Sequence, residues 1–560
     1  MKRIYNASIM VASVCLLAVV SGCTGNFESY NKNPNYPYEQ DVSDVEYIVS
    51  LFPAMVNTIL HSQQNRSQHI EQMVGQYGGH LVTSANWNGS NFANFNPPQD
   101  WIDAPWNDGF TGFYANFLKL RDLTDGEGYI YHLGNIIRVA SQHRIADIYG
   151  PIPYSQIGTS MTVPYDSVKD VYINMINDLS ASVEALTEIV ELAPGTAVPI
   201  GPYDYVYNAS SGAMLAKWVK YANSLKLRLA VRIALKSETA GFAKEAIEEV
   251  MTHSIGPILS NADNALNSSI PENETAGYYA ATSWGDVRIN ATLTTYMNAL
   301  KDPRTTKYMK AGTQAAPLNY TGNIGVRMGA VTGANNQYFD FDLNPGVAPE
   351  TYTIMNVTTP EPVLLFCAAE TYFLLAEAAV RGWYTGSQTA QQLYEAGIQS
   401  SMEQYGVAIG NYMSETMTAA EAAYSDPRDA STDFKIFESF SDLNSSSVLS
   451  VAWTAQDNDE KKIEAIITQK WLAMYKLGIE SWSEWRRTGY PRIFPGVNDN
   501  SGGKVNNPLN GIKIDEVRMT RRLPYPIIEV NTNPNYAEAL IMLGGADEQK
   551  TELWWAKGNQ

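Results

Sequence analysis

The sequence contains very little cysteine, with only three among its 560 residues. Cys15 and Cys23 lie at the extreme N-terminus, so Cys367 is the one cysteine in the rest of the chain. No disulfide can then form within the body of the protein, which must be held together by burial of apolar surface. Cys367 begins an apolar helical pattern, which predicts a small buried hydrophobic residue rather than a nucleophile.

The N-terminus lacks an apolar run long enough to cross a bilayer. The run from Ile9 to Val20 is far short of the roughly 20 residues that a spanning helix needs. Lys2 and Arg3 precede this run, and the lipobox Val20-Ser21-Gly22-Cys23 ends it. We therefore predict a lipoprotein signal peptide over residues 1–22, and lipidation of Cys23 by acyl chains, including palmitate, that hold the protein on a membrane.

Residues 23–41 are polar and rich in Asn and Pro, which predicts a lipidated tether. The remaining residues, 42–560, are numerous enough for a large core, in one large domain or in two or three smaller ones.

Positive charge is scarce, since 39 Lys and Arg face 58 Asp and Glu and give a formal net charge of −19. This balance argues against nucleic acid and against an anionic membrane patch as partners, because both are gripped by clusters of Lys and Arg. Aromatic residues, by contrast, are plentiful, with 34 Tyr and 12 Trp. Their amphipathic rings suit ligands that combine an apolar face with many hydroxyl groups.

Catalytic and metal-binding motifs are missing from the sequence. It has no H-E-x-x-H, C-x-x-C, G-x-S-x-G, Walker A or G-x-G-x-x-G pattern, and its six histidines show no ligand spacing. The segment from Asp340 to Asn344 resembles the start of a calcium loop, but Pro345 and Thr351 replace the Gly and Glu that such a loop needs. We therefore predict no enzyme activity, no metal and no cofactor.

Apolar residues recur mainly at helical spacing, which predicts a mainly α fold. From Lys217 to Leu235 they form one stripe, with the basic residues mostly elsewhere on the helix, so a helix packed on one side is expected. Stripes from Ala369 to Val380 and from Ala390 to Ser401, separated by Gly382, predict a tetratricopeptide-like helix pair with small residues at its crossing. Further helices are predicted over Val45–Gly78, Phe113–Asp122, Gly134–Tyr149, Ser167–Leu192, Phe242–Thr252 and Lys461–Leu477.

Long stretches rich in Gly, Asn, Pro and Tyr separate these helices. Loops of such length within a compact chain are usually functional. They cover Thr83–Gly112, Gly256–Asn290, Gly312–Thr359 and Pro495–Asn510.

The first of these stretches is the best candidate for a sugar site, which needs flat aromatic faces beside amide donors. Trp87 and Trp101 lie among Asn, Gly and Pro in what reads as loop, and Asn86 and Asn88 flank Trp87. We predict that these four residues contact ligand. Other aromatic residues nearby follow helical spacing and are expected to be buried: Phe110, Phe113, Tyr114 and Phe117.

Several blocks stand out along the chain. They are Arg144–Ser155 with Val163–Asp166 and Val171–Tyr172, Trp218–Arg232, Lys301–Arg304, Ala369–Ala378, Gln469–Trp471, Glu484–Pro491 and Arg522–Pro526. Together they resemble one family, the SusD/RagB outer-membrane lipoproteins of Bacteroidetes. The blocks occur in family order from about Asn33 to the C-terminus, so the resemblance covers nearly all the mature chain and implies that residues 42–560 form a single domain. Most of their residues suit fold determinants better than ligand contacts, as in the i, i+3 pair of Glu484 and Arg487.

The resemblance implies a cell-surface lipoprotein of the outer membrane, built on tetratricopeptide-like helix pairs with irregular loops on one side. Such proteins cap a SusC-like TonB-dependent transporter, hold a glycan or a peptide, and deliver it for import without covalent chemistry. Thr24 to Glu28 lacks the acidic run that would mark surface export, so exposure outside the cell rests on the family alone.

The resemblance also implies that the regions around the Lys301–Arg304 block line the ligand site. By position it points to Tyr278, Tyr279, Trp284, Asp286 and Arg288, with Tyr320, Asn336 and Tyr338 as weaker candidates. We hypothesise that Trp87 and Trp284 form opposite edges of a shallow ligand platform.

Glycan capture for a transporter is the favoured function. Peptide cargo remains open, because Asn-rich loops can also bind a peptide backbone. A tetratricopeptide-type protein scaffold without a small ligand remains open too, because helix pairs of this kind commonly bind proteins.

Overall fold

The computed structural model describes residues 44–60, 75–83, 89–160, 162–269, 287–313, 321–330, 352–357, 362–425, 434–435, 448–505 and 519–556. The chain forms two units, Met1–Ser50 and Leu51–Gln560. In the first unit the described part is helix α3 (Asp44–Val49) and Ser50. The account that follows concerns the second unit.

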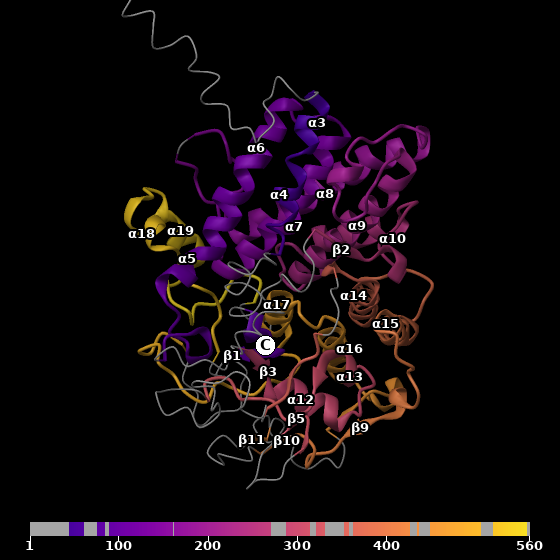
Figure 1. The fold of residues 1–560 in the computed structure, drawn as a ribbon, viewed down its shortest axis with the longest axis vertical. Helices are drawn as coiled ribbons and strands as arrows, with labels where there is room; N and C mark the ends of the chain where they lie inside the picture. Colours follow the sequence, from indigo (N-terminus) through magenta and orange to yellow (C-terminus); the bar gives the residue numbers. More distant parts are fainter. Residues whose placement is uncertain are drawn as a thin grey trace, which may run out of the picture. The chain divides into compact units, whose positions relative to one another are not determined.

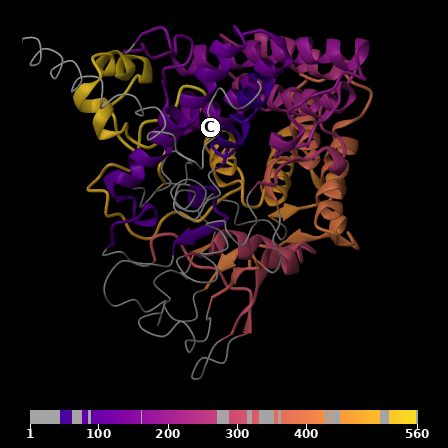
Figure 2. The same cartoon turned by 45° about the horizontal axis from the view of Figure 1, so that its top comes forward.

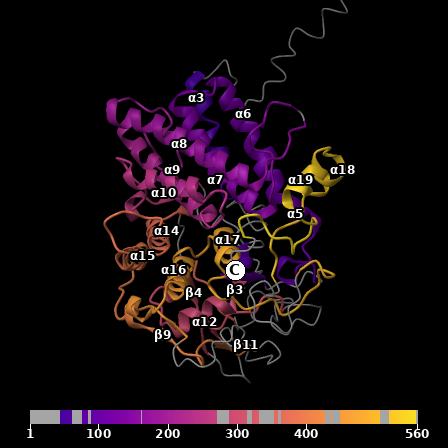
Figure 3. The same ribbon diagram turned by 180° about the vertical axis from the view of Figure 1, so that it is seen from behind.

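The second unit is mainly helical, as predicted. In Figures 1 and 3, helices α6 to α10 lie at one end of this unit and most of the short strands lie at the other. The helices are α4 (Phe52–Val56), α5 (Gln99–Asn107), α6 (Phe113–Leu123), α7 (Gly128–Tyr149), α8 (Val168–Leu192), α9 (Ala216–Ile233), α10 (Ala240–Thr252), α12 (Ala291–Ala299), α13 (Thr305–Tyr308), α14 (Ala368–Val380), α15 (Ala390–Gln404), α16 (Asp459–Ala473), α17 (Gly478–Thr488), α18 (Ile527–Thr532) and α19 (Tyr536–Leu543).

Short antiparallel pairs of strands join distant parts of the chain. Each described sheet has two strands. They pair β1 (Leu81–Thr83) with β3 (Val287–Ile289), β2 (Ala265–Asn267) with β8 (Val363–Phe366), β4 (Met309–Lys310) with β7 (Ile354–Met355), β5 (Gly312–Thr313) with β6 (Thr321–Gly322), β9 (Thr416–Met417) with β12 (Leu449–Ser450), and β10 (Ala423–Tyr424) with β11 (Phe434–Lys435).

Helices that follow one another along the chain pack as neighbours. Helix α8 packs against α7 and α9, α9 against α10, and α14 against α15 and α16, while α9 also meets α14. Figure 2 shows the magenta helices across the top and the orange ones at the right. Within the described residues, no helix combines the length and the hydrophobicity that crossing a membrane requires.

The predicted pair of α14 and α15 is confirmed. A Cβ atom on Gly397 would lie 2.7 Å from the Phe373 ring, so only glycine lets the two helices approach this closely. Gly382 follows α14 with φ +69°, a left-handed conformation that ends the helix. Cys367 is fully buried before α14, and burial raises the pKa of its thiol to about 12, as expected of a structural cysteine.

Two predictions about helices are wrong in detail. The helix predicted over Val45–Gly78 is described only as α3, α4 and the 3₁₀ turn η2 (Gly75–Gly78), and residues 61–74 lie outside the described part. The expected one-sided packing of α9 also fails, because every residue from Tyr221 to Ile233 is buried, basic residues included.

The buried basic residues of α9 belong to a network of charged side chains that joins five helices. None of its members is more than 3% exposed. They are Asp147 on α7, Arg228 and Arg232 on α9, Glu370 and Glu377 on α14, Lys470 on α16, and Glu480, Glu484 and Arg487 on α17. We call this set the ionic network.

Bidentate pairs fix the geometry of the ionic network. Arg228 donates from Nε and Nη2 to the two carboxylate oxygens of Glu370, at 2.8 and 2.7 Å. Arg487 donates from Nη1 and Nη2 to the two carboxylate oxygens of Glu377, at 2.7 and 2.6 Å. Its Nη2 also donates to Glu484 at 2.6 Å, which confirms the predicted i, i+3 pair. Charge-assisted forks of this kind hold two helices at one distance and one angle.

The local field keeps the carboxylates of Glu480 and Glu484 ionised. Burial alone would raise the pKa of Glu480, but Arg232, Arg228 and Lys470 outweigh it and hold the pKa at about 2. The pKa of Glu484 is also lowered, because Arg487, Lys470 and Arg232 outweigh the effect of burial. These charges are therefore paired throughout the neutral pH range.

A second buried cluster of hydrogen-bonded side chains forms around the Lys301–Arg304 block. Arg304 donates from Nε and Nη2 to Asp302, at 2.9 and 2.6 Å, and from Nη1 to Ser401 on α15 at 2.8 Å. Tyr412 donates to Asp302 at 2.9 Å and also bonds Gln469 on α16. This block therefore ties the start of α13 to two other helices.

Candidate functional site

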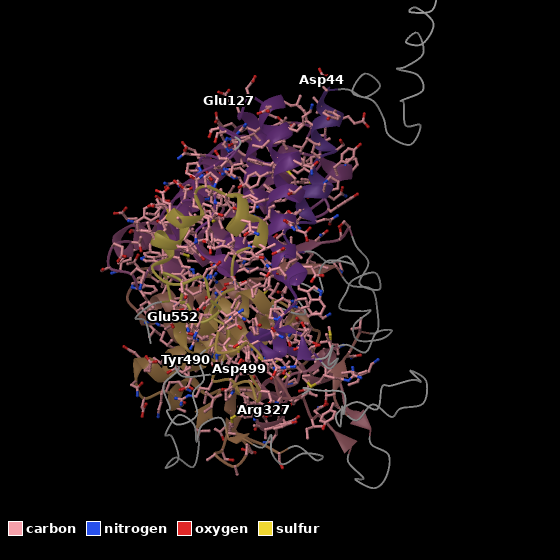
Figure 4. The ribbon with its side chains drawn as sticks, turned by 90° about the vertical axis from the view of Figure 1, so that its left-hand side faces the viewer. Asp44, Glu127, Arg327, Tyr490, Asp499 and Glu552 are labelled. Carbon is pink, nitrogen blue, oxygen red and sulfur yellow. The ribbon has the colours of Figure 1, made fainter. Side chains whose placement is uncertain are left out.

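The four long stretches predicted to be functional meet at the strand-rich end of the second unit. Figure 4 places Arg327 and Asp499 at this end and Glu127 at the opposite one. The described segments that meet are 81–96 without 84–88, 287–291, 324–330 and 494–501. We call this set the loop ring.

Strands β1 and β3 form the first side of the loop ring. They are antiparallel, with Leu81 opposite Ile289 and Thr83 opposite Val287. Thr83 and Val287 therefore lie opposite each other at one end of the ladder. The next side is formed where Val326 donates to the Ile289 carbonyl at 2.9 Å and Ala291 donates to the Val326 carbonyl at 2.8 Å.

Segment 494–501 closes the ring. Val497 donates to the Met328 carbonyl at 2.8 Å, and the side-chain amide of Asn498 donates to the Gly329 carbonyl at 2.8 Å. Asn500 then reaches the first segment, donating from its backbone to the Asn94 carbonyl at 2.9 Å and from its side chain to the Gly89 carbonyl at 3.2 Å.

Gly329 shows how tightly the segments approach one another. Its φ is +75°, and an added Cβ would lie 3.0 Å from the Asn498 nitrogen and 3.2 Å from the Ala93 carbonyl oxygen. Backbone from two other segments occupies that space, so no larger residue fits without displacing one of them.

The helical scaffold supports the ring through α16 and the turn η2. His80 bonds the Trp471 carbonyl through Nε2 at 3.0 Å, and Trp471 donates from Nε1 to the Gly78 carbonyl at 2.6 Å. Tyr77 donates to the Phe92 carbonyl at 2.9 Å. Burial lowers the pKa of His80 to about 4 and raises that of Tyr77, so both groups are neutral near pH 7.

Two of the predicted ligand contacts lie among the described residues. Trp101 lies on α5, so its expected position in a loop is wrong. Helix α5 was not predicted because Pro98 precedes it and Pro105 lies within it. Its half-buried ring stacks on Phe92 with centroids 6.0 Å apart. Arg288 lies on β3, is 2% exposed and donates to the Val287 carbonyl, so its side chain packs inward beneath the surface.

The other predicted contacts lie outside the described residues. They are Cys23 for lipidation, and Asn86, Trp87, Asn88, Tyr278, Tyr279, Trp284, Asp286, Tyr320, Asn336 and Tyr338 for ligand. Of the aromatic residues expected to be buried, Phe113, Tyr114 and Phe117 are at most 5% exposed, whereas Phe110 is half-buried.

Sequence reasoning marked the stretch that contains segment 494–501 but named none of its residues as a site residue. The run Val497–Gly503 is rich in Asn, Asp and Gly, which marked the stretch as a functional loop but did not single out Asn498 or Asn500. Only the long-range bonds of these two asparagines reveal their place in the ring.

The described part of the ring offers groups suited to recognition. Asn96 and Asn500 are exposed amides, and Trp101 is a half-exposed aromatic residue. Among the described residues, no group of three or more His, Cys, Asp or Glu side chains is arranged to hold a metal ion. Amides beside aromatic faces suit noncovalent binding of a hydroxyl-rich ligand.

Comparison with known proteins gives a consistent assignment. Residues 29–556 match the model of the SusD-like family, described as Susd and RagB outer membrane lipoprotein. Among solved structures, a SusD-like protein from Bacteroides thetaiotaomicron and a SusD homologue from Bacteroides uniformis are each 30% identical, with TM-scores of 0.77. A chitin-binding SusD homologue from Flavobacterium johnsoniae is 29% identical, also with a TM-score of 0.77.

In all three comparisons the alignment covers 91% of this chain and 99% of the other. No curated protein matches the chain.

Proposed function

The chain belongs to the SusD-like family of outer membrane lipoproteins, and from this premise we propose that it captures a glycan at the loop ring and delivers it to a SusC-like TonB-dependent transporter. Binding without turnover is the role of the protein in this proposal. The observation that carries it is the convergence of four long loops into one ring at one end of the helical scaffold.

A glycan is the favoured cargo for two reasons. A relative that is 29% identical over nearly its whole length binds chitin, a polysaccharide. The ring itself presents exposed amides, and the half-exposed Trp101 stacks beside it on Phe92; such groups bond sugar hydroxyls and stack on sugar rings.

The ligand platform is proposed to lie between Trp87 and Trp284. Trp87 follows Thr83 by four residues, and Trp284 precedes Val287 by three. Thr83 pairs with Val287, so the described residues nearest in sequence to the two tryptophans lie at the same end of one ladder, which supports the proposal. Further proposed contacts are Asn86, Asn88, Trp101, Tyr278, Tyr279, Asp286, Tyr320 and Tyr338, whereas the buried Arg288 is left out because its side chain packs inward.

Calorimetric titration of the soluble protein, beginning at Thr24, tests the cargo. Polysaccharides, chitin oligosaccharides and peptide digests are added in turn, and each mixture is checked for hydrolysis. Saturable binding of one glycan without cleavage is expected. Binding of peptides alone would show that the cargo is a peptide, and no binding of any of these ligands would favour a protein scaffold.

Single alanine substitutions at Trp87 and Trp284 test the platform. Each is expected to weaken glycan binding about two- to tenfold, since an aromatic stacking contact is worth about 0.5–1.5 kcal/mol. The matched control is Trp554→Ala, because this half-buried tryptophan donates to Glu238 at 2.9 Å and has no place in the ring. Unchanged affinity in both Trp87→Ala and Trp284→Ala would refute the platform.

The membrane arrangement is part of the same proposal. Residues 1–22 are a signal peptide, residues 23–41 a tether, and acylated Cys23 holds the body at the outer face of the outer membrane. Intact cells treated with protease should lose the protein, and Cys23→Ala should release it from the membrane fraction. Copurification of a TonB-dependent barrel in equal amount with the detergent-solubilised wild-type protein tests the partner.

A further inference from the structure

The segment from Gly89 to Asn96 requires outside support to keep its shape. Phe95 has φ +59°, a left-handed conformation that is costly for a bulky residue. Within the segment, Asn91 accepts from the Asn94 backbone at 2.9 Å, and Asn96 donates to the Asn91 carbonyl at 3.0 Å. These local bonds shape the turn but do not fix it to the rest of the molecule.

Three other elements hold this segment through its carbonyl groups. Tyr77 donates to the Phe92 carbonyl, and Gln549 donates from Nε2 to the Phe95 carbonyl at 2.9 Å. Both of these donors are buried, at 0% and 3% exposure, and belong to the scaffold. Asn500 supplies the third attachment, through its backbone to Asn94 and through its side chain to Gly89.

Asn500 differs from the other two donors in its position. It is exposed, so its side chain fills no space in the core. Its two bonds span the segment, since Asn94 precedes the left-handed Phe95 and Gly89 lies at the beginning. Asn500 therefore attaches the beginning of the segment to segment 494–501, whereas Tyr77 and Gln549 bind the carbonyl groups of Phe92 and Phe95.

We propose that Asn500 is a positioning residue for ligand binding. Its side-chain amide fixes Gly89 and thereby holds the segment 89–96, which carries Phe92, in place before ligand binds. The proposal rests on the proposed function, because it requires the ring to hold the ligand. Phe92, on which Trp101 stacks, follows Gly89 by three residues, and the proposed contact Asn88 precedes it directly. Fixing a loop before binding removes an ordering cost that would otherwise weaken affinity.

The test uses Asn500→Asp, which keeps the size of the side chain but removes the N–H donor. Its carboxylate would face the Gly89 carbonyl, so the bond is replaced by repulsion. Asn500→Ala removes the side chain without adding charge. The matched control is Asn531→Asp on α18, an exposed asparagine that undergoes the same charge change outside the ring.

Two measurements are made on each variant of the soluble protein. Hydrogen exchange reports the protection of amides 89–96, and calorimetry with N-acetylglucosamine hexasaccharide reports affinity. Both Asn500 variants are expected to exchange faster at 89–96 and to bind about three- to tenfold more weakly. Their thermal midpoints should stay within about 1 °C of wild type, because an exposed hydrogen bond contributes only about 1 kcal/mol.

Exchange at 89–96 that matches wild type in both Asn500 variants would refute the positioning role, and that outcome needs no ligand. Faster exchange with unchanged affinity would assign Asn500 a purely structural role and overturn the proposal. A wild-type protein that binds no glycan in the panel would instead overturn the proposed function, while hydrogen exchange would still decide whether Asn500 positions the segment.

Discussion

The pair of Arg228 and Glu370 offers the sharpest test of how the scaffold is stabilised. The two side chains are 1% and 0% exposed and share two hydrogen bonds, of 2.8 and 2.7 Å, between α9 and α14. Removing one partner of such a buried pair leaves an uncompensated charge and costs about 3–5 kcal/mol. We therefore expect Arg228→Met and Glu370→Met each to lower the free energy of unfolding by about 4 kcal/mol.

The double variant should behave differently from the sum of the two single ones. Removing one positive and one negative charge together leaves the net charge of the network unchanged. Glu480 still pairs with Arg232, and Lys470 still lies 3.3 Å from Glu484. The double variant should therefore lose about 4 kcal/mol or less, instead of the roughly 8 expected for independent sites.

Urea unfolding followed by tryptophan fluorescence measures these losses, because five fully buried tryptophans report on the core. Unfolding entropy of about 2.1 cal/mol/K per residue over about 500 residues converts a loss of 4 kcal/mol into a fall of about 4 °C in the thermal midpoint. The exposed pair Lys462–Asp459 is the control, since its 2.8 Å contact has similar length but Asp459 is 72% exposed. Methionine at either control position should cost less than about 1 kcal/mol.

A double variant as unstable as the sum of its single variants would refute this account. The account would also be refuted if Arg228→Met and Glu370→Met lost no more free energy of unfolding than the variants of the exposed control pair.

Three further predictions concern the scaffold. Burial lowers the folded pKa of His80 from 6.5 to about 4, so the stability that neutral His80 contributes is complete above pH 6.5 and is lost as pH falls toward 4. The free energy of unfolding, measured from pH 7.5 to 4.5, should therefore fall less steeply in His80→Gln than in wild type. Near pH 5 the two slopes should differ by about 1.4 kcal/mol per pH unit. Gly397→Ala should lower the free energy of unfolding by about 1–3 kcal/mol, because its Cβ would press on the Phe373 ring, and an equally stable variant would show that the helices separate freely. Cys367 should react with a thiol reagent only at the rate of global unfolding, since it is buried with its pKa raised to about 12, and fast labelling of the native protein would contradict this.

The sequence predicted helices where apolar spacing is regular and failed where charge or proline interrupts it. Helices α14 and α15 were placed closely because their apolar stripes and Gly382 leave few alternatives. On α9, Arg228 and Arg232 read as a solvent-facing side, because nothing local reveals acidic partners 142 and 248 residues further along the chain. Helix α5 was missed because Pro98 and Pro105 imitate a loop.

The candidate site could be predicted as a set of loops but not as a ring. Length and composition marked all four stretches, because Gly, Asn and Pro disfavour regular elements. Their meeting depends on single backbone and amide bonds between residues far apart, such as Asn500 with Gly89, and such bonds leave no periodic signal in a sequence.

The ionic network constrains which substitutions the helical frame accepts. Each buried charge in the network depends on partners that stand on other helices, so a change at one position is penalised unless a distant position changes with it. A charge on α9 can therefore be replaced without loss only together with its partner on α14 or α17, which makes the five helices one coupled unit for substitution.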